Sequence, residues 1–495
     1  MLPASGLKVN FHKSKVFGIG VSSNEIASGA RILGCEAGSF PFKYIGVPVG
    51  ANMNLKRNWI PVIEKTKSKL SSWKAKNLSF GGRLTLIKSV LGSIPLFYLS
   101  LFKAPKSVVD CLEKIRRKFL WGGCEERNKI NWVAWKVVLG SKKQGGLGVR
   151  SIASMNWALL IKWLWRFKNE NTTLWRRVVC GIHNNSRKPV SSLSLKIPSG
   201  VWYNSVKSVD MLVEVGIDIF SIFHIQVKGG ENTLFWTDNW TGCGLLEKRK
   251  SSFIAERFED NKFRGHWKRN PSDSDEIKEL QDLRGFTDSL SLSNGLDIWK
   301  SKLSSTDEFL VQHVWTLIDS KVTIPKPNPT VWLKLVPIKV IFFVWRACID
   351  RIPSAVALAG RGIAVPNSSC HLCSNAIDDT NHFLVGCSTT REVLDWILNW
   401  CGIPLQNVQT VTDLVQYAAM WGNCPKMRKV LLAIVYGLLW CAWKARNDAI
   451  FNKMRSTPTK IADNVVTLVC GWVKHRGNFV NCSWANWITF PFSIL

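Results

Sequence analysis

A short run of metal-ligating residues constrains this chain more than any other feature. Cys370, Cys373, His382 and Cys387 follow one another in the pattern C-x2-C-x8-H-x4-C. Three thiolates and one imidazole form the ligand set of a closed, tetrahedral, structural zinc site, which has no open position for water. We therefore predict structural rather than catalytic Zn²⁺. The alternative is that the four residues pack separately, but the compactness of the set favours zinc.

The residues around the ligands predict how the chain brings them together. The first two cysteines can share one tight turn, and Asp378 or Asp379 can cap a short helix that carries His382. On an ideal α-helix, His382 and Cys387 point about 140° apart, which is poor geometry for a shared ion. We expect Gly386 to end the helix in a left-handed conformation and to return Cys387 to the metal.

The charge of the chain points to a polyanionic partner. The 495 residues include 66 Lys and Arg against 35 Asp and Glu, which gives a net charge of +31. An excess of this size is far beyond what solubility needs and favours nucleic acid. A basic but inert surface is the alternative. Residues 1–180 hold 31 of the basic and 8 of the acidic residues, a net +23, so we expect the binding face mainly there.

The sequence also indicates in which cellular compartment the protein resides. Residues 1–6 lack the apolar core of a signal peptide, and the 14 cysteines are scattered apart from the cluster. We expect an intracellular protein of the nucleus or cytoplasm, not a secreted one, with thiols free or on metal. The longest apolar run, Val430 to Trp443, is too short to span a bilayer, so it predicts a buried helix and no membrane partner.

Hydrophobic spacing predicts a mostly helical chain of the α+β class. Strand-like segments and a hairpin at 40–50 precede helical stretches at 55–73, 78–101, with a break at Pro95, and 108–120. In the first helical stretch the apolar face recurs at spacings of 3 and 4 through Trp59, Val62, Ile63, Thr66, Leu70 and Trp73. A further helix is expected at 153–167.

Tryptophan is abundant, with 25 residues, and has two interpretations. Trp157, Trp163 and Trp165 lie among Lys162 and Arg166, a basic and aromatic mixture that suits stacking on single-stranded nucleic acid. The alternative is core packing, since tryptophan buries a large area, and we favour packing for most of the 25.

Several motifs, taken in order, resemble the non-LTR (LINE-type) reverse transcriptases of plants. Lys13 with Ser14 resembles their motif D, and the run FKYIGVP at 42–48 resembles motif E, the primer grip. Residues 119–166 resemble the thumb and the region after it, and 332–387 resemble the reverse transcriptase zinc-binding domain. The run WKARN at 443–447 resembles the segment that precedes ribonuclease H. Each motif is weak alone, but their order is specific.

The resemblance implies a domain order and a set of contacts. The expected regions are a palm remnant with hairpins (1–50), a helical thumb and post-thumb region (51–180), a mixed linker or connection domain (181–324), a small helical zinc-binding module (330–400) and a C-terminal helical region before an absent ribonuclease H domain (401–495). The expected nucleic-acid contacts are Phe42, Lys43, Tyr44, Ile45 and Gly46 of the primer grip, with Lys65, Lys69, Lys74 and Arg83. Lys13 would lie near the phosphates of the incoming nucleotide. The partners implied are RNA, RNA–DNA hybrid or DNA, and the oligomeric state stays open.

The family's polymerase needs paired palm aspartates to hold two Mg²⁺ ions. Residues 1–50 offer only Glu25 and Glu36 as acids. We therefore expect a truncated RNA-directed DNA polymerase that binds RNA or hybrid and is inactive alone, with Mg²⁺ relevant only to an intact polymerase. Two alternatives are open: a non-catalytic nucleic-acid-binding zinc protein, and a helical interaction scaffold in which zinc is only a staple.

Overall fold

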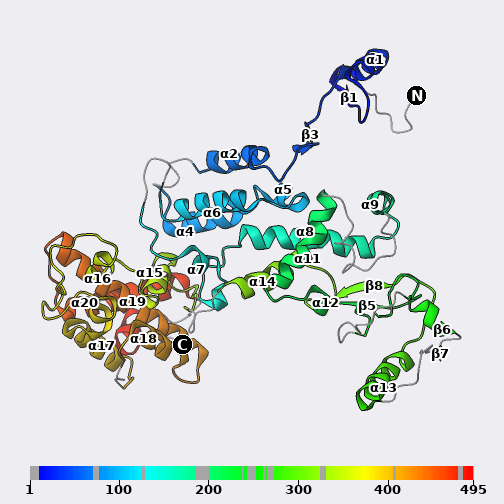
Figure 1. Ribbon diagram of the computed structural model, residues 1–495. Coiled ribbons are helices and arrows are strands. Elements are labelled where there is room, and N and C mark those ends of the chain that lie inside the picture. The colour runs from blue at the N-terminus through cyan, green and yellow to red at the C-terminus, as the bar shows by residue number, and fades with distance from the viewer. Residues whose placement is uncertain are drawn as a thin grey trace. The chain divides into compact units, whose positions relative to one another are not determined.

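The chain is mostly helical. The computed structural model describes residues 10–70, 77–123, 129–183, 200–236, 238–241, 252–259, 262–264, 273–323, 330–404, 408–477 and 483–493. Helices make up 57% of the structure and strands 6%, and the strands form small two-stranded ladders (Figure 1). The predicted class, α+β and mostly α, is confirmed.

The contacts of the chain gather into two compact units, each built from separate stretches of sequence. The first unit contains Met1–Leu70, Val90–Ile115 and Ser151–Ile318, and the second contains Ser71–Ser89, Arg116–Arg150 and Asp319–Leu495. The stretch expected to be the thumb, 51–180, contributes to both units. The five-region division stays a prediction.

The first unit opens with two small β elements. β1 (Lys15–Val16) pairs in parallel with β2 (Glu36–Ala37), and α1 (Ser23–Leu33) connects them. A capping box between Ser22 and Glu25 begins α1. β3 (Phe42–Tyr44) and β4 (Val47–Val49) then form an antiparallel hairpin whose two turn residues both have positive φ. The predicted hairpin is therefore confirmed.

Four helices follow around one apolar cluster of the first unit. They are α2 (Ile60–Ser68), preceded by η2 (Lys56–Trp59), then α5 (Leu96–Leu101), α6 (Lys106–Leu120) and α8 (Ile152–Asn169). α2 buries Val62, Ile63 and Thr66, as the spacing predicted. Pro95 stands immediately before α5, where the break was expected. Asn156 of α8 holds α5 by donating to Leu99 O at 2.7 Å.

The remainder of the first unit mixes helices with short strands. Its elements are α9 (Leu174–His183), α11 (Val201–Glu214), α12 (Ile219–Ile222), β5 (Phe223–Gln226), η5 (Ala255–Arg257), β6 (Phe258–Glu259), β7 (Lys262–Phe263), α13 (Ser274–Asp288), β8 (Ile298–Ser301) and α14 (Val311–Val322). β5 pairs antiparallel with β8, and β6 with β7. Trp165 packs 5.1 Å from the ring of Phe223, and Trp163 donates its indole N–H to Ser100 O. These two tryptophans of α8 therefore serve packing, the interpretation favoured from sequence.

The second unit is a helical assembly around one long helix. Its elements are α4 (Phe80–Leu86), the π-helical turn η3 (Ile87–Leu91), α7 (Trp135–Leu139), η4 (Lys142–Gln144), α15 (Ile338–Cys348), α16 (Ala355–Ala359), the π-helical turn η6 (His382–Gly386), α17 (Ser388–Trp400), α18 (Val411–Met420), α19 (Pro425–Phe451), α20 (Pro458–Arg476) and α21 (Trp484–Thr489). α19 contains the apolar run and is buried along most of its length, so the buried helix predicted there is confirmed. No described helix is long and apolar enough to cross a membrane.

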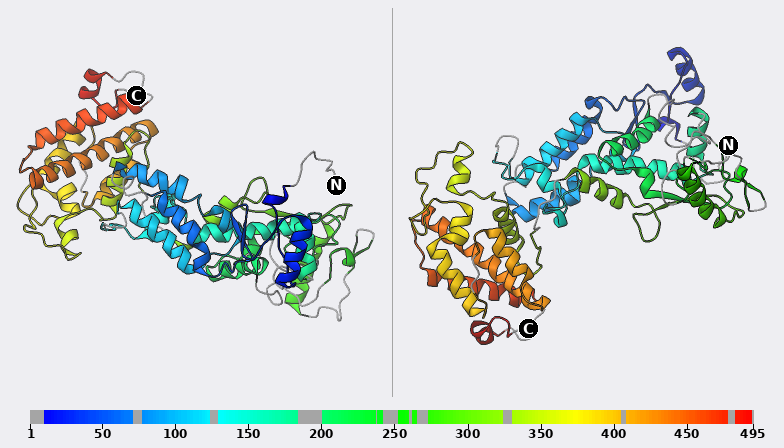
Figure 2. Two further views of the ribbon diagram at one scale, coloured as in Figure 1. Left: turned by 90° about the horizontal axis from the view of Figure 1, so that it is seen from above. Right: turned by 60° about the horizontal axis from the view of Figure 1, so that its bottom comes forward.

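α19 and α20 run side by side at close range (Figure 2). A Cβ placed on Gly437 of α19 would lie 2.5 Å from Cγ2 of Val469 on α20, so the two backbones approach where only glycine fits. A Cβ on Gly471 of α20 would meet no atom within 4 Å. The pair therefore offers two helical glycines with opposite packing environments.

We predict that Gly437→Ala lowers the free energy of unfolding by about 1–3 kcal/mol, because the added methyl overpacks the interface with the stiff Val469 side chain. Gly471→Ala is the matched control and should raise it by about 0.5–1 kcal/mol through better helix propensity. Urea denaturation followed by circular dichroism measures both changes. Equal behaviour of the two variants would contradict this packing of α19 on α20.

Candidate metal centre

The first two cysteines lie in one tight turn, as predicted. Cys370 N–H donates to Ala376 O at 2.6 Å, and Ser374 N–H donates to Cys370 O at 2.7 Å. Ser374 has a φ of 64°, so the chain turns sharply just after Cys373. A β-bridge between Ser369 and Ile377 closes the base of the turn. The backbone thus holds both thiols on one small loop.

The other two ligands are joined by a π-helical turn rather than an α-helix. Asp379 caps it by accepting from the N–H groups of Asn381 and His382 at 2.9 and 3.1 Å, as one of the two predicted caps. Cys387 N–H donates to His382 O at 2.6 Å, an i to i+5 bond. This wider turn places Cys387 beside His382. The expected left-handed conformation of Gly386 is wrong, because the φ of Gly386 is not positive. The extra residue in the π-helical turn, rather than a left-handed glycine, returns Cys387 toward His382.

The four candidate ligand atoms converge. They all lie within 4.8 Å of one another, with Cys370 Sγ 3.9 Å from Cys387 Sγ and Cys373 Sγ 3.3 Å from His382 Nε2. Tetrahedral zinc with ordinary bond lengths sets sulfur–sulfur edges of about 3.8 Å and sulfur–nitrogen edges of about 3.5 Å. In the part of the chain that the structure describes, this is the one group of three or more His, Cys, Asp or Glu residues placed to hold a metal ion.

The surroundings of Cys387 favour its thiolate. Cys387 is fully buried and stands at the N-cap of α17. The hydrogen bond from Cys370 lowers the pKa of Cys387 to about 5, and the backbone N–H groups of Thr390 and Thr389 act in the same direction. The same hydrogen bond, with burial, raises the pKa of Cys370. Both shifts arise from the one hydrogen bond between the two thiols, and a bound cation would replace the proton of that bond.

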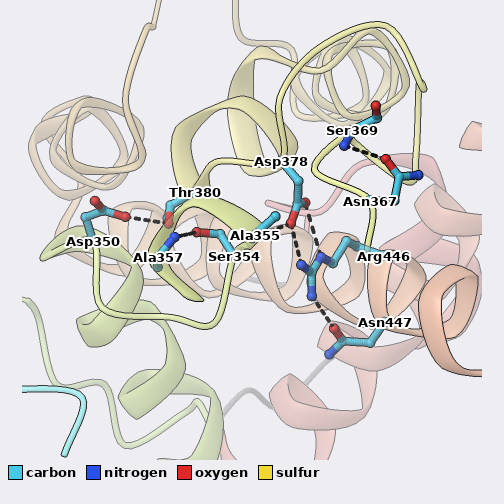
Figure 3. Close-up of polar contacts among 10 residues, drawn as sticks. All are labelled: Asp350, Ser354, Ala355, Ala357, Asn367, Ser369, Asp378, Thr380, Arg446 and Asn447. Atoms are coloured by element: carbon cyan, nitrogen blue, oxygen red, sulfur yellow. Dashed lines mark hydrogen bonds and ion pairs between the residues drawn. The ribbon is translucent and has the colours of Figure 1, made fainter. Parts of the chain in front are cut away.

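A buried ion pair fastens the ligand segment to α19 (Figure 3). Asp378 is fully buried and accepts from Ala355 N–H at 2.8 Å and from Arg446 Nε at 3.2 Å, with a second contact to Arg446 Nη2. The Arg446 guanidinium also lies over the rings of Phe383 and Trp443, at 5.4 and 5.3 Å. Sequence reasoning treated Asp378 only as a possible cap. The sequence did contain a sign of this pair. Arg446 follows just after the apolar run, and a charge in a buried helix needs a partner of opposite charge.

The expected primer-grip residues share one hairpin. Lys43, Tyr44, Ile45 and Gly46 are exposed in β3 and the turn, while Phe42 is half-buried. Tyr44 and Ile45 keep 63% and 74% of their surface exposed, which is unusual for two adjacent apolar side chains. The hairpin tip is tied to α5 by Tyr98, whose hydroxyl donates to Gly46 O at 2.8 Å. The structure therefore brings these five residues together on one projecting tip.

The other expected contacts are spread over both units. Lys13 is exposed in the 3-10 turn η1 (Phe11–Lys13), and Lys65 and Lys69 are exposed at the end of α2. Arg83 lies in the second unit and donates to Leu120 O and Leu78 O, so its guanidinium holds α4 in place. Lys74 lies outside the described residues. Contact of all these residues with nucleic acid stays a prediction.

Comparison with known proteins finds one matching domain family and two related plant proteins. A family described as zinc-binding in reverse transcriptase matches residues 309–394, a range that contains all four candidate ligands. An Arabidopsis thaliana protein named for ribonuclease H is 30% identical over 428 residues, which are 82% of this chain and 65% of that protein. An uncharacterized mitochondrial protein of the same plant is 28% identical over 150 residues, which are 30% of this chain and 92% of that protein.

The chain therefore carries a reverse transcriptase zinc-binding domain. This domain match and the two relatives are typical of plant retrotransposon-derived reverse transcriptase sequences. The resemblance drawn from the ordered motifs is confirmed at this level. The chain spans 65% of the length of the first relative, so the activity of a whole protein does not transfer with the match.

We predict that Asp378→Ala costs about 3–5 kcal/mol of unfolding free energy, because it leaves the Arg446 charge buried without a partner. Asp350→Asn is the control. Asp350 accepts from Thr380 Oγ1 at 2.6 Å and is exposed, and asparagine keeps an oxygen that can accept the same bond, so the change should cost at most about 1 kcal/mol. Urea unfolding gives both values.

A double variant, Asp378→Leu with Arg446→Met, separates the pair from its parts. It should recover much of the loss, since a buried pair can be replaced by apolar residues of similar size at little cost. A double variant no more stable than Asp378→Ala alone would contradict the idea that the unpaired charge causes the loss.

Proposed function

We propose that this chain is the nucleic-acid-binding part of a LINE-type RNA-directed DNA polymerase, built around a structural Zn²⁺. The observation that carries the proposal is the convergence of Cys370, Cys373, His382 and Cys387 inside the range that matches the reverse transcriptase zinc-binding domain. The chain itself would bind RNA or RNA–DNA hybrid and would not extend a primer alone.

The donor set suits zinc in a structural role. Three sulfurs and one imidazole nitrogen are soft and borderline ligands of the kind that Zn²⁺ takes, and four of them complete its tetrahedron. Cys370 and Cys387 are fully buried in the core that contains α19, while Cys373 and His382 are half-buried, so the site forms part of the packed core. An ion there would link the turn at 370–373 to the start of α17.

We predict one Zn²⁺ per chain, and we expect Cys373→Ser and His382→Ala to lose it. Structural zinc in small modules contributes on the order of 10 kcal/mol of apparent binding energy coupled to folding. Protease cleavage near 366–390 should therefore appear in both variants, while the helices of the first unit persist. Metal analysis and limited proteolysis of the full chain measure the two effects.

His371→Ala is the matched control, since His371 lies in the same turn but outside the ligand group. It should keep full zinc. Full occupancy in both ligand variants would rule out this ligand set, and loss of zinc without new cleavage would remove the folding role alone.

Nucleic-acid binding is supported by charge and by the hairpin. Residues 1–180 carry a net charge of +23, and Lys13, Lys43 and Lys65 are exposed cations within that stretch. Tyr44 and Ile45 add exposed apolar surface beside Lys43. Cations next to exposed rings suit a phosphate backbone and its bases. Glu25 and Glu36, the two acidic residues of this stretch before residue 50, both have local partners, Ser22 and Lys15.

We predict that the triple variant Lys13→Ala, Lys43→Ala, Lys65→Ala binds an RNA–DNA hybrid more weakly than the parent chain. If each lysine neutralises one phosphate, the slope of log affinity against log salt should fall by about 0.9 for each lysine removed. Fluorescence anisotropy of a labelled primer–template at several salt concentrations measures this slope.

Lys460→Ala with Lys474→Ala is the control, since both lysines are exposed on α20. It should leave the slope nearly unchanged. A greater loss in the control than in the triple variant would refute the proposed face. Salt-independent or absent binding would instead favour the interaction scaffold, and deoxynucleotide incorporation with Mg²⁺ would refute inactivity.

A further inference from the structure

A surface cavity of about 380 Å³, partly open to solvent, is formed by residues of the second unit. Its lining comes from α4, the π-helical turn η3, η4, the segment before α15 and the end of α20. Cavities of about 300–1,000 Å³ are the size that small ligands occupy. Nothing in the zinc site or the primer-grip hairpin uses this space.

The lining carries positive charges and no negative ones. Lys88, Lys142, Lys334 and Arg476 all contribute to it, and no Asp or Glu does. Among the described residues, none of these four cations forms an ion pair with a carboxylate. Like charges held around one space repel each other, and an anion between them would relieve the repulsion.

Lys88 is held in place by the backbone. It lies in η3, a type of turn that is frequent at functional sites. Its Nζ donates to Leu147 O at 2.5 Å, and a Cβ on Gly148 would lie 3.6 Å from that Nζ and 3.8 Å from Cγ of Lys142. The glycine-rich run 145–148 is no phosphate loop of the P-loop type, but it brings these two lysines together.

The ammonium of Lys88 lacks a counter-charge. The Lys88 residue as a whole is exposed, yet the packing around its ammonium, followed by repulsion from Lys142 and Arg150, lowers the pKa of Lys88 to about 8. A lysine whose only described polar partner is a carbonyl keeps donors free for another acceptor.

Apart from Thr85, the rest of the lining is apolar. Leu84, Ile338 and Ile341 form one part, and Trp332 contributes an indole over which Lys142 Nζ lies at 4.2 Å. A compact inorganic ion would leave this surface unused, whereas a ligand with a charged end and a flat apolar body would contact both parts. Lysine is a common phosphate ligand in proteins.

We propose that this cavity binds a nucleotide unit, with its phosphate between Lys88 and Lys142 and its sugar and base against Trp332 and the aliphatic side chains. The nucleotide is either free or part of a strand, since both present the same phosphate. The site uses none of Lys13, Lys43 and Lys65, the exposed lysines tested above for nucleic-acid binding, and it does not depend on them.

The test is equilibrium binding of uridine 5′-monophosphate, uridine and a short oligouridylate to the zinc-loaded full chain. We expect the two phosphate-bearing ligands, or the oligonucleotide alone, to bind, and uridine not to bind. Lys88→Met and Lys142→Met should each weaken binding at least tenfold. Lys143→Met is the matched control, because Lys143 neighbours Lys142 but does not line the cavity, and it should bind like the parent.

Urea unfolding of the same variants separates binding from folding. A ligand-binding lysine predicts unchanged unfolding midpoints, and Lys142, which is exposed, still tests the site if Lys88→Met is destabilised. Binding of the mononucleotide indicates a free nucleotide, and binding of the oligonucleotide alone indicates a strand.

The Lys13→Ala, Lys43→Ala, Lys65→Ala chain should keep its mononucleotide binding, which distinguishes this site from the proposed nucleic-acid face. Where only the oligonucleotide binds, Lys88→Met and Lys142→Met should weaken its binding further in that background. Binding unaffected by both methionine variants, or displaced by an acidic peptide but not by nucleotide, would overturn the proposal.

Discussion

The buried ion pair between Asp378 and Arg446 is the contact on which the second unit depends. Two charges removed from water are stable only while they face each other, so the pair fixes where the ligand segment sits along α19. α15, α18 and α20 pack on the same helix, and Phe383 of the π-helical turn lies under the Arg446 guanidinium. The position of His382 and Cys387 is thus coupled to the core of the whole unit. A closed metal site gains rigidity from such a support.

This coupling also sets the physical extent of the zinc-binding domain. The family match ends at residue 394, but Arg446 lies beyond it and pairs with Asp378 of the ligand segment. The run at 443–447, which resembles the segment preceding ribonuclease H, belongs structurally to the core that holds the ligands. A fragment cut at the matched boundary would leave Asp378 buried without its arginine. The folded unit is therefore larger than the range 309–394 that the family matches.

The net charge of +23 in residues 1–180 is not all available for nucleic acid. Arg83 donates to two main-chain carbonyls, and Arg116 is buried and donates to Arg150 O. Arg166 pairs with Glu170 at 2.5 Å. Each of these cations has an architectural partner, so a count of charges overstates the binding face. The exposed lysines Lys13, Lys43 and Lys65 form no ion pair with a described carboxylate, and they carry the proposed function.

The sequence by itself determined the features that depend on near neighbours. The spacing of thiols and imidazole predicted the ligand set, capping preference limited the helix cap to Asp378 or Asp379, and the 3 and 4 spacing after Trp59 predicted α2. Only the tertiary structure decided the π-helical return to Cys387, because i to i+5 turns have no distinct hydrophobic period. It also decided the partner of Asp378, 68 residues away, and the meeting of Lys88, Lys142, Lys334 and Arg476 at one cavity. Such contacts depend on how distant helices pack, and no local pattern records that packing.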